Sequence, residues 1–270
     1  MNAGVEQAVA FWRVVHFDAV DSTNDEARRR ALEGDPGRVW FAADRQTAGR
    51  GRRGRTWISP LGNLNVSALL IDCCRPAISP QLGFVAGVAL ARAASDLGAG
   101  ALLKWPNDLI SDGGKCAGLL VEGVMLSGGG FGCIVGIGVN CASAPEGVGY
   151  PAAVLADRSG RAVSRDDLLK RLIARFDEAL AEWRGGDGFA SIRAAWLQRA
   201  AGLGERIRVE IAGGGRRDGV FEGLDPDGRL LFRGDRGLET IEAGDIWVMA
   251  ASRDPSAATP SGTFTREGRV

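Results

Sequence analysis

The 270-residue chain has 33 basic and 33 acidic side chains, so its net charge is zero and binding to nucleic acid through a broad basic face is disfavoured. Its one histidine, His16, cannot build a histidine-based metal site, and we expect it to be an ordinary strand residue. No apolar run is long enough to span a membrane, the N-terminus lacks a secretory pattern, and five cysteines without a C-x-x-C pair indicate reduced thiols; we therefore expect a cytoplasmic protein that does not contact membranes.

Local patterns predict the elements of the first 200 residues. Stretches rich in branched and aromatic residues predict strands at 11–20, 38–44, 65–71, 101–105, 117–125 and 131–139. Capping residues and helical spacing predict helices after Asp21-Ser22-Thr23-Asn24, at 82–97, at 165–183 behind the cap Ser164, and at 189–200. Strands gathered around a few helices, without strict β-α-β alternation, indicate the α+β class with a mixed sheet.

The pattern changes after Gly204, where short β-like runs are joined by Gly and Asp turns. Strands are predicted at 206–211, 219–222, 229–232, 238–242 and 246–249, which is typical of a small antiparallel barrel or sandwich. Residues 251–270 are polar and rich in Ser, Thr, Pro and Gly. We therefore expect a larger domain at 1–201, a small β domain at 204–250 and a disordered tail at 251–270.

Residues 49–58, the Arg/Gly loop, place four arginines among three glycines. Glycine allows close approach of the backbone to a ligand, and arginine matches the geometry of carboxylates and phosphates. The pattern G-x-G-x-x-G also fits a dinucleotide-binding turn, but the residues after Gly54 are not helical, so we reject that interpretation. A small anionic ligand is favoured over a solvated basic loop and over an RG-type RNA-binding segment.

Three further stretches carry polar groups where apolar ones are expected. Lys104-Trp105-Pro106-Asn107-Asp108 aims an amide and a carboxylate from the start of a short apolar run, although an Asx turn would look the same. Lys115 enters an otherwise apolar strand, where a lysine needs a partner such as a phosphate or carboxylate. Gly136-x-Gly138-x-Asn140 leaves one strand face bare, so that a flat ligand or another backbone can approach.

As an ordered set, these stretches resemble the motifs of biotin protein ligases. The matching segments are Ser22-Thr23-Asn24, Gln46-x-x-Gly49-Arg50-Gly51-Arg52-Arg53-Gly54-Arg55-x-Trp57, Lys104-Trp105-Pro106-Asn107-Asp108, Lys115-x-x-Gly118-x-Leu120-x-Glu122 and Gly136-x-Gly138-x-Asn140. The resemblance implies a biotin/lipoate ligase catalytic domain followed by an SH3-like β-barrel. It also implies two half-reactions: biotin and ATP give biotinyl-5′-AMP, and the biotinyl group then passes to a lysine of a biotin carboxyl carrier protein. Neither step needs a nucleophile from the enzyme, in agreement with the scarcity of histidine.

The resemblance also implies residue roles. Hydrogen bonds to the ureido ring of biotin would come from Ser22, Thr23 and Gln46, and the remaining biotin contacts from Gly49, Arg50, Lys115, Gly118, Leu120 and Gly136. ATP would be bound by Arg52, Arg55, Asn107, Lys115 and Asn140. The catalytic groups would be Lys115, Arg50 and Asp108, with Asp108 supporting either Mg²⁺ or the attacking lysine, and Trp57 would pack against the sheet.

Some points depart from the family pattern or stay open. Only ten residues precede the first predicted strand at 11–20, too few for a helix-turn-helix domain, so we expect no binding to operator DNA. No tryptophan lies between Trp105 and Trp183, so Tyr150 or apolar residues are expected to pack against adenine. Lipoate–protein ligation is the alternative activity, and the oligomeric state is open, a homodimer included.

Overall fold

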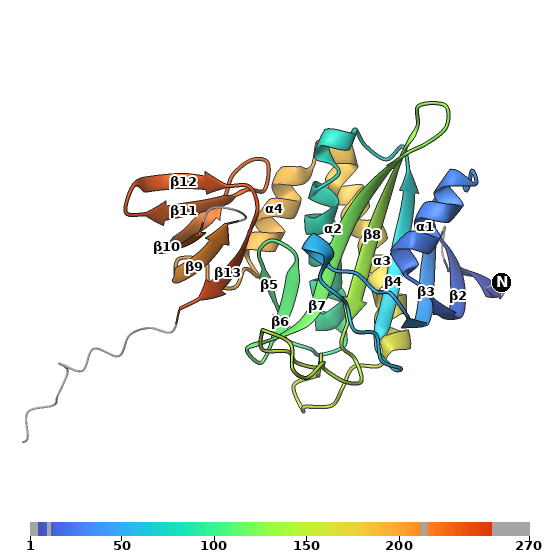
Figure 1. The fold of residues 1–270 in the computed structure, drawn as a ribbon, viewed down its shortest axis with the longest axis horizontal. Helices are drawn as coiled ribbons and strands as arrows, with labels where there is room; N and C mark the ends of the chain where they lie inside the picture. The colour runs from blue at the N-terminus through green and yellow to red at the C-terminus, as the bar shows by residue number, and fades with distance from the viewer. Residues whose placement is uncertain (1–4, 10–11, 212–214, 250–270) are drawn as a thin grey trace, which may run out of the picture.

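The fold is built on two sheets, one mixed and one antiparallel (Figure 1). It is seen in a computed structural model that describes residues 5–9, 12–211 and 215–249. The larger sheet has eight strands in the order β1-β2-β3-β4-β8-β7-β6-β5. Their bounds are β1 Val5–Val9, β2 Trp12–Val20, β3 Val39–Gln46, β4 Leu64–Ile71, β5 Leu102–Lys104, β6 Asp108–Ser111, β7 Gly114–Met125 and β8 Phe131–Val139.

Strands β2 and β3 are the parallel pair of this sheet, and helix α1 (Thr23–Leu32) connects them. Their carboxyl ends lie side by side, because Val20 is the register partner of Gln46. The chain leaves β2 into the cap of α1 and leaves β3 into the Arg/Gly loop. Two segments far apart in sequence therefore start from one edge of the sheet.

Helices cover both faces of the larger sheet. On one face α1 packs Ala27 and Ala31 against Phe17 and Phe41. The other face is covered by α2 (Gln81–Asp96), α3 (Arg165–Trp183) and α4 (Phe189–Leu197). Short 3₁₀ turns lie at Arg52–Gly54, Pro76–Ile78 and Arg184–Gly186. The predicted cap of α3 is confirmed, because Ser164 Oγ accepts a hydrogen bond from the backbone N–H of Asp167.

The second sheet has five antiparallel strands in the order β12-β11-β10-β9-β13. Their bounds are β9 Arg206–Ile211, β10 Gly215–Leu224, β11 Leu230–Gly234, β12 Gly237–Ile241 and β13 Gly244–Val248. The predicted antiparallel strands are confirmed, but over the described residues the hydrogen-bonded order is open, with β12 and β13 at its edges. The Trp105 indole N–H donates to the Gly228 carbonyl at 3.1 Å, which fastens this sheet to the first.

Two strands of the larger sheet escaped prediction. β1 has the sequence VEQAV, which lacks a run of branched or aromatic residues. β6 is four residues long and begins at the polar residue Asp108. The strand predicted from residue 117 begins at Gly114. The charged residue Lys115 interrupts the apolar pattern, so the first residues of the strand were not predicted. The predicted tail 251–270 lies outside the described residues. Within the described ranges, every helix is too short or too polar to cross a lipid bilayer.

Candidate active site

A pocket opens where the amino end of α1 faces the middle strands of the larger sheet. Many of the residues predicted for the site line it, and the lining includes Ser22, Thr23, Asn24, Gln46, Arg50, Trp57, Lys115, Gly118, Leu120, Gly136 and Gly138. They come from the cap of α1, the end of β3, the Arg/Gly loop, β7 and β8. The geometry thus brings together segments that are more than a hundred residues apart.

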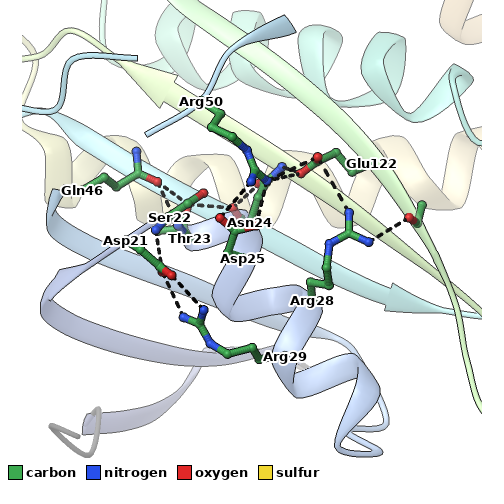
Figure 2. A network of polar contacts seen from close by, with 12 residues as sticks. Asp21, Ser22, Thr23, Asn24, Asp25, Arg28, Arg29, Gln46, Arg50 and Glu122 are labelled. Atoms are coloured by element: carbon green, nitrogen blue, oxygen red, sulfur yellow. Dashed lines mark hydrogen bonds and ion pairs between the residues drawn. The ribbon is translucent and has the colours of Figure 1, made fainter. Parts of the chain in front are cut away.

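A network of hydrogen bonds forms one wall of the pocket (Figure 2). Gln46 Oε1 accepts from the backbone N–H of Thr23 at 2.8 Å and from its hydroxyl at 3.1 Å, while Gln46 Nε2 donates to Ser59 Oγ at 2.9 Å. The Ser67 hydroxyl lies 2.7 Å from Thr23 Oγ1 and 2.6 Å from Asn24 Oδ1. Ser22 is the N-cap residue of α1 but makes no side-chain cap bond, so the helix does not use its hydroxyl.

Glycines in β7 and β8 leave three positions of the opposite wall without side chains. A Cβ on Gly138 would overlap the Trp57 indole, and a Cβ on Gly136 would overlap the Asn24 amide. At Gly118 a Cβ would lie 3.2 Å from the Trp57 ring and 3.2 Å from Lys115 Nζ. The bare face predicted from the sequence is therefore present, and the expected packing of Trp57 against the sheet is confirmed.

Arg50 projects from the Arg/Gly loop into a pair of carboxylates (Figure 2). Its guanidinium nitrogens lie 2.8 Å and 2.9 Å from the Asp25 carboxylate oxygens and 3.2 Å from Glu122 Oε2. Asn24 Nδ2 donates to the same Glu122 oxygen at 2.7 Å. Burial opposes the charge of Arg50, but the charge of Glu122 and the hydrogen bond to Asp25 outweigh it and raise the pKa of Arg50.

Lys115 and Asp108 form an ion pair at the junction of β6 and β7. Lys115 Nζ lies 2.8 Å from Asp108 Oδ1, and the two side chains are only 16% and 18% exposed. The ammonium also lies over two aromatic rings, 5.7 Å from the centre of Trp57 and 5.3 Å from that of Tyr150. The partner that a lysine in an apolar strand requires is therefore Asp108.

The remaining arginines of the loop point to other partners. Arg52 Nη1 donates to Asn107 Oδ1 at 2.9 Å, and burial lowers the pKa of Arg52. Arg53 and Arg55 lie 3.4 Å and 3.3 Å from the carboxylate of Asp245, at the start of β13. The loop turns back on itself through the backbone bonds Gly51 N to Arg55 O and Trp57 N to Gly49 O, and no α-helix opens after its glycines. That geometry supports rejecting the dinucleotide-binding interpretation.

Asn140 supports the site from outside the pocket. Its Nδ2 donates to the carbonyls of Lys115 at 3.3 Å and Ala153 at 3.1 Å, so its amide fixes the start of β7. His16 is an exposed strand residue 3.0 Å from Asp44, as expected.

Sequence reasoning missed several groups at the site. Asp25 and Glu122 hold Arg50, and Asn65 accepts from the Trp57 indole N–H at 3.3 Å. The amide nitrogen of Asn65, Nδ2, is buried without a hydrogen-bond partner in the described structure. Glu122 belongs to the Lys115–Glu122 motif, so the sequence carried a signal for it. No local pattern distinguishes Asn65 from other strand residues.

Comparisons with known proteins agree with this geometry. Residues 17–140 match the model of the biotin/lipoate A/B protein ligase family, and residues 202–249 match the biotin protein ligase C-terminal domain. The chain is 41% identical to a biotin–[acetyl-CoA-carboxylase] ligase of Paracoccus denitrificans, over 84% of this chain and 97% of that one. A ligase of the same name from Mycobacterium tuberculosis is 32% identical, over 87% and 89% of the two chains.

A solved structure also aligns over most of the chain. Biotin protein ligase from Aquifex aeolicus, in complex with biotin and ATP, is 29% identical with a TM-score of 0.73, over 87% of this chain and 98% of that one. The chain belongs to the biotin protein ligase family. Its relatives place biotin ahead of lipoate, the alternative that the sequence left open.

Proposed function

We propose that the chain joins biotin to a lysine of a biotin carboxyl carrier protein in two ATP-dependent half-reactions. The observation that carries the proposal is the pocket itself: a hydrogen-bonding wall from α1 and Gln46 faces a strand wall made bare by glycines, with Lys115 and Arg50 beside it. A neutral bicyclic ring with polar edges and an anionic tail suits such a pocket. We propose residues 1–201 as the catalytic domain and 204–250 as a C-terminal domain that assists it.

In the first half-reaction, a carboxylate oxygen of biotin attacks the α-phosphorus of ATP, and the bond to the bridging oxygen breaks as pyrophosphate leaves. Both reactants are anions, so the protein must place cations between them. Lys115 takes the α-phosphate and the biotin carbonyl, and Arg50 takes the carboxylate. Arg52 and Arg55 bind the ATP phosphates, which requires Arg55 to exchange Asp245 for a phosphate.

The biotin ring is assigned to the polar wall and the glycines. Ser22, Thr23 and Gln46 hydrogen-bond the ureido group, and the N-cap hydroxyl that α1 leaves unused supports the role of Ser22. Gly49, Gly118, Leu120 and Gly136 line the ring. Trp57 covers the bare face, where it packs on Gly138.

The nucleotide is assigned to the neighbouring segments. Asn107 faces it together with Arg52, whose guanidinium it already contacts. Asn140 acts by fixing the strand that carries Lys115. Tyr150 lies over Lys115 Nζ and is the aromatic side chain that we assign to adenine packing.

Magnesium fits the site only together with ATP. In nucleotide sites Mg²⁺ binds one or two carboxylates plus phosphate oxygens, and Asp108 offers one carboxylate beside Lys115. Across the described residues, three or more side chains that could ligate a metal converge only in a cysteine cluster elsewhere. Asp108 would therefore hold the ion with the phosphates, and the ion would supply neutralisation of phosphate charge.

In the second half-reaction, the neutral amine of the carrier lysine attacks the acyl carbon of biotinyl-5′-AMP. The carbon–oxygen bond breaks, AMP leaves with the electron pair, and the amine loses its proton as the amide forms. We assign Asp108, the carboxylate beside Lys115, to accept this proton when it does not hold an ion. We place this ATP-consuming reaction in the cytoplasm, where the five free cysteines stay reduced.

The test is ATP–pyrophosphate exchange with and without biotin, followed by transfer to a purified carrier domain. We expect exchange that depends on biotin and is not supported by lipoate, with biotin binding measured by titration calorimetry. Exchange without biotin, or exchange with lipoate at the same rate, would overturn the proposal. RNA binding that falls steeply with salt, without ATP turnover, would instead favour the nucleic-acid interpretation of the loop.

A further inference from the structure

Three of the five cysteines meet at the end of the larger sheet. Cys73 and Cys74 lie in the loop that follows β4, after Asp72, and Cys133 lies near the start of β8. The two strands are antiparallel with Leu70 opposite Cys133, so the register itself brings the sulfurs together. Cys74 Sγ lies 3.9 Å from both Cys73 Sγ and Cys133 Sγ, and all three sulfurs lie within 4.8 Å of one another.

The two 3.9 Å spacings match sulfurs bound to one metal ion, and the third sulfur pair lies within 4.8 Å. With metal–sulfur bonds of about 2.3 Å, tetrahedral to trigonal angles place the sulfurs ~3.8–4.0 Å apart. A disulfide would require a separation of about 2.05 Å, and the three thiols are free. The sulfurs are thus close to coordination spacing without being bonded.

The surroundings favour a soft ion and give it a way in. Cys133 is fully buried against the core under the helices, whereas Cys73 and Cys74 are half-buried, so the cluster is open on the side of the loop after β4. Its donors are sulfur alone, a set that selects Zn²⁺, Cu(I) and similar ions over Mg²⁺ or Ca²⁺. Cys133 packs into the core shared with α2 and α3, while Gly136 on the same strand faces α1 and the pocket.

We propose that Cys73, Cys74 and Cys133 form a binding site for one thiophilic metal ion of the Zn²⁺ or Cd²⁺ type, separate from the ATP-linked magnesium. Each thiol gives up its proton to bind, so a divalent ion and three thiols yield a tris-thiolate complex and three protons. A water molecule can complete four-coordination on the exposed side. The complex would tie the loop after β4 to β8.

The two other cysteines supply matched controls. Cys116 is buried in β7, with its Sγ donating to the Leu109 carbonyl at 3.4 Å, and Cys141 is buried after β8. Neither belongs to the cluster. A Cys116→Ala chain therefore has the same number of thiols as a single variant of the cluster.

The experiment titrates the reduced, full-length chain with Cd²⁺ and follows the ultraviolet thiolate-to-metal absorption, with Zn²⁺ as competitor. We expect one equivalent to bind. Cys74→Ser should weaken binding at least about 100-fold, since even loss of an outer-shell partner costs about 10–100-fold. Cys116→Ala should bind Cd²⁺ as the wild type does. One equivalent of metal should raise the unfolding temperature of the wild type and of Cys116→Ala but not that of Cys74→Ser.

Two results would overturn the site. One is equal affinity of wild type and Cys74→Ser for Cd²⁺, and the other is no saturable equivalent in the reduced wild type. Cys74 is half-buried in a loop, so its serine variant is expected to fold even if a change at the buried Cys133 does not. The Cd²⁺ affinity of Cys74→Ser is therefore the deciding measurement, and Cys133→Val is measured in addition where it folds.

Discussion

Replacing Lys115 by methionine tests the central assignment, because it removes the charge and keeps most of the volume that packs beside Trp57 and Tyr150. A charge-assisted hydrogen bond contributes about 1.5–3 kcal/mol, and removing a donor aimed at developing charge typically costs about 10²–10³ in rate. The Lys115 side chain is only 16% exposed, so water cannot readily replace its ammonium group. We therefore expect biotin-dependent ATP–pyrophosphate exchange to fall by about 10²–10³-fold.

The same substitution leaves Asp108 without its cation. Breaking a fully buried ion pair costs about 3–5 kcal/mol, and the cost here is smaller because both groups retain some exposure. The double variant Lys115→Met/Asp108→Asn should recover most of that stability but not the exchange, while Lys170→Met, at an exposed position on α3, should change neither. Near-wild-type exchange from a folded Lys115→Met chain would refute the role of Lys115.

Three further predictions concern the bare strand face, the Arg/Gly loop and the buried thiols. Gly138→Ala should raise the KM for biotin because its Cβ displaces the indole packed there, whereas Gly100→Ala, where a Cβ meets nothing within 4 Å, should not; equal KM values would contradict this. Asp245→Ala should speed amide hydrogen exchange over the Arg/Gly loop, and biotin with ATP should restore protection; unchanged exchange in both states would count against a clamp. Burial raises the pKa of Cys116 and Cys141 from 9.0 to about 12, so the folded chain holds these protons more tightly than the unfolded chain. The contribution of the two thiols to the free energy of unfolding is complete below pH 9 and is lost as the pH rises toward 12. Stability measured by urea unfolding should therefore fall more steeply between these pH values in the wild type than in Cys116→Ala/Cys141→Ala. Parallel plots of stability against pH for the two proteins would refute this.

Local patterns sufficed for the parts of the fold where one segment decides its own structure. The capping residues before α1 and the branched residues of β4 are visible in short segments, so these two elements were predicted. Lys115 was identified because a charge in an apolar strand demands a partner. β6 was missed because four residues starting at Asp108 carry too little pattern to distinguish a strand from a turn.

The partners of the site residues depend on strand order, which no single segment encodes. The contact of Arg50 with Asp25 and Glu122 needs α1 and β7 to meet at the loop, and Asp245 reaches the loop from another sheet. The meeting of Cys74 with Cys133 likewise follows from the β4–β8 register. These contacts became visible only with the three-dimensional structure.

The paired charges of the pocket have a consequence for selectivity. Arg50, Arg53, Arg55 and Lys115 each face a carboxylate of the protein. A lone phosphate must compete with those internal anions for every cation, so abundant free phosphate gains little by entering. A ligand that also fills the ring pocket gains further contacts and can displace the carboxylates. Pyrophosphate has no such contacts after its bond to the α-phosphorus breaks, so the carboxylates can pair with the cations again. The carboxylates of Asp25, Asp108 and Asp245 would thus lower the affinity of the site for simple anions and favour release of pyrophosphate.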